Sequence, residues 1–523
     1  AGVNDEIIPK HGGKAGLLSE SDREFLDSRQ VALAPTARES MYIQRFYLYL
    51  NLTKPSRCLY LSYAQSNAQG QAQSPAYLIA MILRMYPKLV IQDNPKDEIS
   101  QMQMAQQATE ILMEGLRKDG EQQQNDGWKE LFSWYLRSKE WKEQCLRWIQ
   151  AAYEGAPESS IGKAAAVALY GKELENSATE LERFAACAFA HFLQYGMKLT
   201  ERVEYEFKPM DMGNVMHEAL ESFAEEVRKR GMEWTELTEQ ERNEIADRCL
   251  DNIVADYGNT VLKSSARNEY MIERTRRILR RTVWALQKQL EQGEFQPEGF
   301  EVTFGGGRID RVDIMEDQNK VYVKVIDYKT GNTSFDLVYL YHGLQLQLMI
   351  YLDGALRVEQ KKYPDKEIIP AGVFYYNIKD PMIQEKIDAD VEAVSAGLMK
   401  ELKMNGLVQA DPELVYRMDS SLGSIPVAFN KDGSFRKNSS VADRTQFAVL
   451  GRYVRTKIEK IRSSILEGDA EVSPYELGKK NACTYCPYMT VCGFDRRLSG
   501  YEFRRLKNFS DEELWKAFDR EAE

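Results

Sequence analysis

The sequence contains no hydrophobic run long enough to cross a bilayer. A membrane-spanning helix needs about 20 mostly apolar residues, and the longest candidates here are short pieces such as Tyr77–Leu83. Residues 1–10 (AGVNDEIIPK) have neither the basic start nor the apolar stretch of a secretory signal. We therefore expect a cytoplasmic protein that does not bind membranes.

Cysteine is also scarce, with 7 residues in 523. A small, odd number of cysteines excludes a disulfide scaffold and fits a reducing compartment. The chain has no G-x4-G-K-[S/T] phosphate loop, so the sequence predicts no ATP-binding site of that type. The formal net charge of −11 at pH 7 argues against indiscriminate coating of nucleic acid by the whole surface.

The remaining composition, 43% hydrophobic and 28% charged, is typical of a folded chain with several domains. Residues 20–54 predict amphipathic helices ended by Pro55, residues 58–63 predict a short buried strand, and residues 76–172 predict helices. We expect four tryptophans in the helical stretch to be core residues rather than a platform for stacking bases: Trp128, Trp134, Trp141 and Trp148.

A second region starts near Ser177. After helices to about residue 291, the runs 301–314 and 320–328 predict two strands of a hairpin, followed by a helix over 338–356 and a strand over 371–378. This order predicts an α/β core. We also expect a hairpin around Asp432-Gly433, and a capping box at 510–513 before a short amphipathic helix.

One predicted helix is strongly basic. Between Arg267 and Arg281 there are six arginines and only two glutamates. A solvated helix face and a contact surface for phosphates both explain this pattern.

Acidic residues interrupt the apolar pattern of the two predicted strands, at Asp310 in GGRIDRVD and Asp327 in VIDYKTG. Asp327 and Lys329 are two residues apart, so both point to one face of their strand. Burying a lone charge is costly, and these groups need either each other or a cation. A buried salt bridge is the structural alternative to an active site.

Three further residues complete a candidate site. His217 lies on a predicted helix before the strands, and Gln347 and Tyr351 are one turn apart on the helix after them. Carboxylates bind Mg²⁺ through oxygen, and a nearby lysine can orient water and stabilise a phosphate that is being attacked. Together these groups predict phosphodiester hydrolysis.

The same residues resemble a known family. Gly307-Arg-Ile-Asp310, Asp327-Tyr-Lys329 and Gln347 with Tyr351, preceded by His217, are similar to PD-(D/E)xK nucleases of the RecB type. More narrowly, GRIDRVD, VIDYKTG and YHGLQLQLMIYLD resemble the nuclease domain of the B subunits of AddAB helicase-nucleases. The resemblance implies Mg²⁺ ligands at Asp310 and Asp327, His217 as a further ligand or water organiser, and Lys329 beside the attacking water. It also implies that Gln347 and Tyr351 position the DNA strand.

The cysteines extend the resemblance. Cys187, followed about 300 residues later by Cys483, Cys486 and Cys492, matches the split iron-sulfur site of that family. The C-x2-C-x5-C run supplies three thiolates and needs a fourth ligand. Spacing alone also fits zinc or unliganded core thiols, and only the resemblance implies a [4Fe-4S] cluster. Ala188 stands where the family usually has proline. Cys58, Cys145 and Cys249 are expected to be buried hydrophobic residues.

Residues 39–63 resemble motif VI of superfamily 1 helicases, with Thr53-Lys54-Pro55 where active helicases have Thr-Arg-Ala. Lysine cannot reproduce the bidentate contact of arginine with phosphate. The resemblance thus implies a degenerate helicase-like region at 1–172 and a nuclease domain at 173–523, without ATPase activity of its own. It implies a partner A subunit, contacts with single- and double-stranded DNA, and degradation of the 5′-ended strand in double-strand break repair. The alternative is a nuclease-inactive module that binds DNA and holds the partner.

Overall fold

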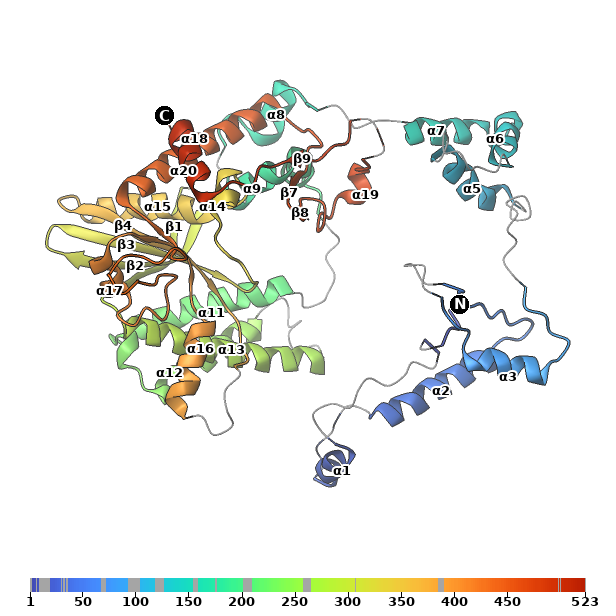
Figure 1. Ribbon diagram of the computed structural model, residues 1–523, viewed down its shortest axis with the longest axis horizontal. Coiled ribbons are helices and arrows are strands. Elements are labelled where there is room, and N and C mark those ends of the chain that lie inside the picture. Colours follow the sequence, from blue (N-terminus) through green and yellow to red (C-terminus); the bar gives the residue numbers. More distant parts are fainter. Residues whose placement is uncertain are drawn as a thin grey trace. The chain divides into compact units, whose positions relative to one another are not determined.

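The computed structural model describes the chain except residues 1, 6, 9–18, 30, 32, 34–35, 67–71, 93–103, 118–126, 154–158, 175, 201–208, 257–264, 306, 384–389, 497, 499 and 523. Two compact units are present, Ala1–Ala152 and Tyr153–Glu523, here called unit 1 and unit 2 (Figure 1). Within the described part of the chain, every helix is too short or too polar to cross a bilayer.

The boundary between the units lies before the one at residues 172/173 expected from the sequence. Helix α8 (Lys163–Tyr170) and the residues before it contact unit 2, because Ile161 N donates to Gly468 O at 2.9 Å and Lys163 pairs with Glu467 at 2.6 Å. The helicase-like nature of the first part of the chain stays a prediction.

Unit 1 is helical in its described residues. The two amphipathic helices predicted over residues 20–54 are confirmed, and each begins with a capping box, at Ser19 and at Thr36. The second ends at Thr53, two residues before Pro55, because proline cannot continue a helix. The helices are α1 (Glu20–Ser28), α2 (Ala37–Thr53), α3 (Tyr77–Met85), α5 (Ala105–Arg117), α6 (Gly127–Arg137) and α7 (Lys142–Tyr153).

The tryptophans of this region mostly belong to the core, as predicted. Trp128 is buried, and Trp141 and Trp148 pack edge-on against the buried ring of Tyr135. The expectation is wrong for Trp134, which is 50% exposed because it lies on the outer side of α6.

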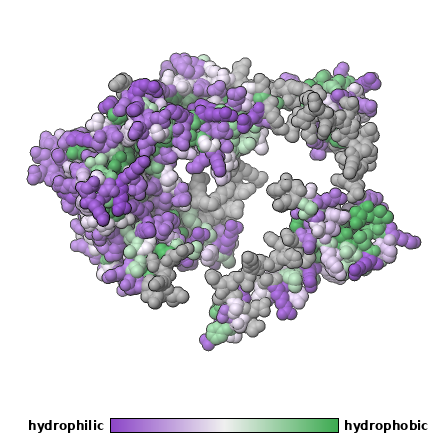
Figure 2. Space-filling view, in the orientation of Figure 1, coloured by the Kyte–Doolittle hydropathy of each residue, from purple (hydrophilic) through white to green (hydrophobic). Residues whose placement is uncertain are grey.

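The buried strand predicted over residues 58–63 is wrong. The segment has no strand conformation, Tyr60 is 88% exposed, and Cys58 is exposed rather than buried. A strand needs a partner for its backbone groups, and this segment gains only single contacts such as Val3 N to Ser62 O at 2.8 Å. Figure 2 shows hydrophobic residues gathered in the part of unit 1 that contains α3.

Unit 2 is built on a six-stranded mixed sheet in the order β1-β2-β3-β4-β5-β6. The first three strands form an antiparallel meander, β4 runs parallel to β3, β5 is antiparallel to β4, and β6 is parallel to β5. The strands are β1 (Gln296–Phe304), β2 (Gly307–Asp317), β3 (Lys320–Lys329), β4 (Glu367–Asn377), β5 (Asn405–Gln409) and β6 (Val441–Ala442).

Helices cover both faces of the sheet (Figure 1). One face packs on α11 (Pro209–Lys229), α12 (Glu239–Asp256) and α13 (Ala266–Leu290), and the other on α15 (Gln347–Lys362) and α18 (Arg444–Glu467). Side chains along β3 point alternately to the two faces of the sheet, so the strand contributes to both cores. Val323 and Val325 face α15, and Tyr322 and Ile326 face the layer of α11, α12 and α13. The predicted α/β fold is therefore confirmed.

The remaining elements surround this core. They are α9 (Ala178–Ala186), α10 (Ala188–His191), the π-helical turn η1 (Phe192–Gly196), the 3₁₀ turn η2 (Trp234–Glu236), α14 (Leu337–Tyr341), α16 (Val391–Glu401), α17 (Pro412–Met418), α19 (Met489–Cys492) and α20 (Asp511–Ala522). A second, small sheet has the order β8-β7-β9, formed by β7 (Tyr475–Leu477), β8 (Lys480–Asn481) and β9 (Arg504–Arg505).

Several predicted boundaries differ from the structure. Residues 301–314 are not one strand, because the chain reverses after Phe304 and the halves pair as β1 and β2. The helix predicted over 338–356 is interrupted between Tyr341 and Gln347, where Gly343 adopts a φ of 78°. Around Asp432, a single bridge joins Phe429 to Phe435.

The hairpin of β2 and β3, the strand at 371–378 and the terminal helix are confirmed. The predicted cap is present, because the Glu513 carboxylate accepts from Ser510 N at 3.1 Å.

Candidate nuclease site

Three carboxylates form a row across the first three strands of the large sheet. Phe300 pairs with Arg311 and Val302 with Ile309, so Glu301 lies opposite Asp310. Arg311 pairs with Ile326, so Asp327 is the next position opposite Asp310 on the other side. Side chains opposite one another on a sheet are direct neighbours. The register thus gathers three negative charges at one place.

The first part of this row meets a histidine. His217 on α11 places Nδ1 3.4 Å from an Asp310 oxygen and 3.8 Å from a Glu301 oxygen. One ligand atom from each of the three residues lies within 4.8 Å of the others. Glu301 also forms an ion pair with Arg308. His217, Glu301 and Asp310 thus form a compact set of candidate metal ligands.

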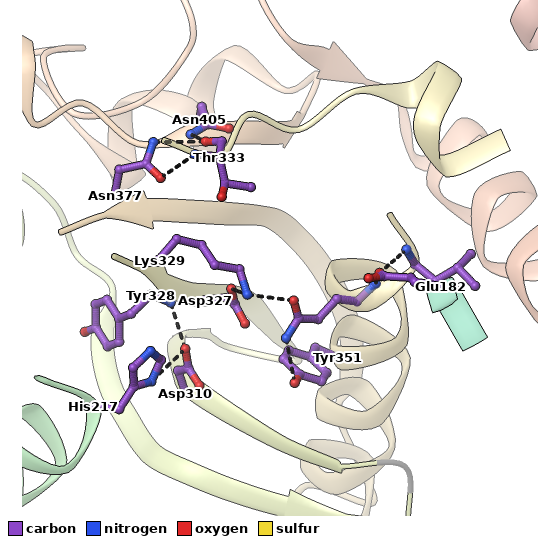
Figure 3. Close-up of polar contacts among 12 residues, drawn as sticks. Glu182, His217, Asp310, Asp327, Tyr328, Lys329, Thr333, Tyr351, Asn377 and Asn405 are labelled. Atoms are coloured by element: carbon purple, nitrogen blue, oxygen red, sulfur yellow. Dashed lines mark hydrogen bonds and ion pairs between the residues drawn. The ribbon is translucent and has the colours of Figure 1, made fainter. Parts of the chain in front are cut away.

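A chain of polar contacts continues from Asp327 (Figure 3). Lys329 Nζ lies 2.7 Å from an Asp327 oxygen and donates to Gln347 Oε1 at 2.8 Å. Gln347 Nε2 in turn donates to the hydroxyl of Tyr351 at 2.9 Å. The helical spacing predicted for Gln347 and Tyr351 is confirmed, since both lie on the first turns of α15. The lysine ammonium is thereby held between a carboxylate and an amide oxygen.

Glu182 on α9 stabilises this series of polar contacts through the backbone of helix α15. One of its oxygens accepts from Leu346 N at 2.7 Å and from Gln347 N at 3.0 Å. These amides open helix α15, which lacks a capping side chain of its own. A carboxylate there also meets the positive end of the helix dipole. Glu182 therefore fixes the backbone of the residue that contacts Lys329.

Burial perturbs the acids of the site. Desolvation, reinforced by neighbouring Asp310, raises the pKa of Asp327 to about 7, although Lys329 opposes the shift. Desolvation likewise raises the pKa of Glu182 to about 7. For His217, burial lowers the pKa, but the Asp310 and Glu301 carboxylates outweigh it and raise the value to about 10. Neutralising so concentrated a set of acids favours bound protons or a cation.

The donor set fits a divalent cation. Carboxylate oxygens are the ligands preferred by Mg²⁺ and Mn²⁺, and imidazole extends the range to other divalent metals. The orientation of the carboxylates is already constrained, because Tyr328 N donates to Asp310 at 2.7 Å. Residues from α11, β1 and β2 thus form one part of the site, and residues from β3 and α9 contact the first turn of α15.

The four cysteines singled out in the sequence line a common cavity. Cys187 directly follows α9, and Cys483, Cys486 and Cys492 lie on the segment after β8, with Phe189 and Tyr488 also lining the space. Burial, followed by the negative charge of the other three thiolates, raises the pKa of Cys483 to about 12. A cationic centre would relieve that repulsion.

The arginines of the basic helix α13 fall into two groups. Arg276 and Arg280 form ion pairs with Asp247 on α12, at 3.7 and 2.5 Å, and so have a structural role. The other arginines of this helix, at positions 267, 274, 277 and 281, lie on a different side of it. Cys145 and Cys249 are buried, as expected.

Of the predicted metal ligands, His217 and Asp310 lie in the compact set, whereas Asp327 lies outside it, opposite Asp310 and paired with Lys329, which contacts the predicted Gln347 and through it Tyr351. The structure adds two residues that sequence patterns miss. Glu301 escapes prediction when residues 301–314 are taken for one strand. The run of three glycines at 305–307 is the sequence feature that could have revealed Glu301 as a site residue, since a chain reversal between β1 and β2 places it opposite Asp310. For Glu182, a carboxylate one turn before Cys187 is visible, but no local pattern connects it to residue 347.

Comparison with known proteins agrees with this geometry. The profile of the PD-(D/E)XK nuclease superfamily matches residues 175–493. Over its whole length the chain is 40% identical to the B subunit of the ATP-dependent helicase/deoxyribonuclease of Lachnoclostridium phytofermentans, covering 47% of that protein. The protein of the same name from Clostridium acetobutylicum is 32% identical over 99% of this chain and 48% of its own length.

The chain therefore spans about half the length of the curated relatives it matches. Both the carboxylate row and the matched segment lie in unit 2, and on this evidence the chain belongs to the PD-(D/E)XK nuclease superfamily.

Proposed function

We propose that unit 2 is a Mg²⁺-dependent deoxyribonuclease that hydrolyses single-stranded DNA. One observation carries the proposal: the row of carboxylates across β1, β2 and β3 ends beside an ammonium group, with Lys329 Nζ 2.7 Å from Asp327 and 2.8 Å from Gln347. A purely structural salt bridge would need one acid for one lysine. Here two further acids and a histidine form a compact set beside that pair, with Asp310 opposite Asp327 on the neighbouring strand.

Asp310, Asp327 and His217, together with Glu301, would hold the metal ion. Bound Mg²⁺ supplies Lewis acidity and lowers the pKa of a coordinated water. Lys329 donates from Nζ to the attacking water or to the negative charge that develops on the phosphate. Gln347 holds the lysine in place, and the buried Tyr351, bonded to Gln347, would help to position the DNA strand through it.

The cysteines support a second part of the proposal, a [4Fe-4S] cluster held by Cys187, Cys483, Cys486 and Cys492. The four sulfurs line one cavity, and the resemblance of the cysteine pattern to the split site of AddAB B subunits favours an iron-sulfur cluster over zinc. Arg183 Nη2 approaches Cys486 Sγ at 3.8 Å and adds positive charge beside the thiolates. Metal analysis of the purified protein, with iron and sulfide expected and stoichiometric zinc as the contrary result, tests this assignment.

By similarity to the B subunits of helicase/deoxyribonucleases, we propose that the chain works with a partner A subunit in the cytoplasm and degrades the 5′-ended strand at double-strand breaks. ATP turnover would come from the partner, because the chain lacks a phosphate loop and has Lys54 in place of the motif VI arginine. Measurable ATP hydrolysis by the purified chain would contradict this division of labour.

The test of the nuclease is cleavage of labelled single-stranded DNA with Mg²⁺ and with EDTA. Lys329→Ala and Asp327→Ala should each reduce the rate by at least about 100-fold, since both act on the reacting groups. Lys361→Ala, an exposed lysine at the far end of α15, is the control. Undiminished cleavage by both site variants would remove the assignment, and DNA binding without any cleavage by the parent would favour the inactive DNA-binding module.

A further inference from the structure

Helix α13 carries a row of basic and aromatic side chains along one side. Arg267, Tyr270, Arg274, Arg277, Arg281 and Trp284, here called the α13 stripe, follow one another at intervals of three or four residues. Residues at that spacing lie on the same side of a helix. The stripe covers 17 residue steps, which is roughly 26 Å at 1.5 Å per residue.

The packing of α13 does not account for this stripe. The arginines that hold α13 to α12 are Arg276 and Arg280, which pair with Asp247 and Asp251. Among the described residues, no ion pair involves the stripe arginines 267, 274 or 281. Arg277 pairs with Asp380 at 2.6 Å, yet its side chain remains 64% exposed. The positive charge of the stripe is therefore available to an external anion.

The aromatic members are placed to contact flat ligands. Tyr270 is 65% exposed between Arg267 and Arg274, although an exposed tyrosine ring gains nothing from folding. The Arg281 guanidinium lies over the ring of Trp284 at 5.4 Å from its centroid, which orients the cation along the helix surface. Tyr270 is thus the exposed ring of the stripe, whereas Trp284 is half-buried. Cations beside an exposed ring are the elements with which proteins bind single-stranded nucleic acid, through phosphates and base stacking respectively.

The stripe also leads to the nuclease site. Arg277 contacts Asp380, three residues after the end of β4 at Asn377. Asn377 pairs with Lys329, and Ile378 N donates to Lys329 O at 2.7 Å. The middle of the stripe therefore lies beside the sheet end that carries Lys329. Helix α11, which carries His217, packs in the same layer as α13.

We propose that the α13 stripe is a binding track for single-stranded DNA outside the reacting groups. The inference rests on the proposed function, because it assigns the strand's approach to that same site. Charge complementarity selects the ligand: the chain as a whole is acidic, with a net charge of −11, whereas the stripe gathers four arginines on one side of a helix, three of them exposed and Arg281 half-exposed. The exposed tyrosine selects unpaired bases over duplex, in which the bases are already stacked.

The experiment measures binding of fluorescent oligo(dT) and of a duplex of equal length by the full chain, in EDTA, at several salt concentrations. The test variant is Arg267→Ala/Arg274→Ala/Arg281→Ala. A matched control, Arg228→Ala/Arg357→Ala/Arg452→Ala, removes the same charge from exposed positions on other helices. Replacement of the three stripe arginines by lysine tests charge alone, and Tyr270→Ala tests stacking.

The stripe variant should bind oligo(dT) at least about tenfold more weakly and lose about 2 from the slope of log affinity against log salt, because three phosphate contacts are removed. The lysine variant should keep most of the slope. Tyr270→Ala should weaken oligo(dT) binding about fivefold or more and leave duplex binding unchanged.

Equal weakening by the stripe and control variants, or equal loss of duplex and oligo(dT) binding, would overturn the proposal. Because binding is measured without divalent metal, failure of the nuclease assignment is separate: it would appear as no Mg²⁺-dependent cleavage by the parent chain.

Discussion

Glu182 offers a sharp test of how the nuclease site is built, because it touches no substrate. One of its two carboxylate oxygens accepts hydrogen bonds from the backbone amides of Leu346 and Gln347, at 2.7 and 3.0 Å. Glu182→Ala leaves both buried amides without a partner. Loss of a helix cap costs about 0.5–2 kcal/mol, and a backbone amide left unpaired away from water costs about 1–3 kcal/mol, so we expect a loss of about 1–3 kcal/mol in the free energy of unfolding.

The same change should affect catalysis. Gln347 begins helix α15 and holds Lys329 at 2.8 Å, so loss of the cap frees the first turn and displaces the lysine. A misplacement of about 1 Å costs up to about 100-fold in rate. Glu182→Gln retains an oxygen at the accepting position, and we expect it to recover most of the activity. Glu459→Ala, on the exposed side of α18, is the matched control.

Urea unfolding and Mg²⁺-dependent cleavage of single-stranded DNA check both expectations. Glu182 should also make the free energy of unfolding depend on pH. The pKa of Glu182 is raised by burial from 4.5 to about 7, so the folded state holds this proton more tightly than the unfolded state does. Stability from this group is therefore full below about pH 4.5 and is lost as the pH rises to about 7. Glu182→Gln should remove that slope. The reasoning is refuted if Glu182→Ala matches the control in stability and rate.

Three further predictions concern the metal ligands and the cysteines. Because burial and Asp310 raise the pKa of Asp327 to about 7, Mn²⁺ affinity measured by electron paramagnetic resonance should fall more steeply below that pH, by up to a further tenfold per pH unit. Asp327→Asn should remove this added steepness and leave only the dependence due to His217, whose pKa is raised to about 10; an unchanged pH profile would contradict the assignment. Glu301→Gln should weaken Mn²⁺ binding about tenfold while leaving the melting temperature within a few degrees; unchanged affinity would exclude Glu301 as a ligand. Cys486→Ala should abolish the brown iron-sulfur absorbance and expose unit 2 to proteolysis, because a centre joining Cys187 to the other cysteines closes a loop of about 300 residues, for which chain entropy predicts about 6 kcal/mol. Protease resistance equal to the parent would contradict this stabilising role of the cysteines.

Helix α9 connects the two centres of unit 2. It carries Glu182, which caps α15, and it ends at Cys187, in the cysteine cavity. Arg504 on β9 donates to Ala185 O, which fastens the small sheet to the same helix. We therefore expect that loss of the proposed cluster would displace Gln347 through this one helix, without any redox step in phosphodiester cleavage.

Local patterns in the sequence were sufficient for residues whose neighbours are close along the chain. Asp327 and Lys329 share a face because a strand has a period of two, and Gln347 and Tyr351 because a helix turns every 3.6 residues. The cap at Ser510 needs only four residues. The α/β class followed from the order of such segments, since each has its own hydrophobic period.

Tertiary structure alone decided the contacts that depend on register and packing. Glu301 joins Asp310 only because β1 folds back on β2, and a strand's own pattern does not reveal its partner. The segment 58–63 has the composition of a strand, but no other strand lies beside it, so its backbone forms no ladder of sheet hydrogen bonds. Glu182 reaches residue 347 across 165 positions through the packing of α9 beside α15. Such contacts are set by how faces are buried against one another, and that information is distributed over the whole core rather than held in any local segment.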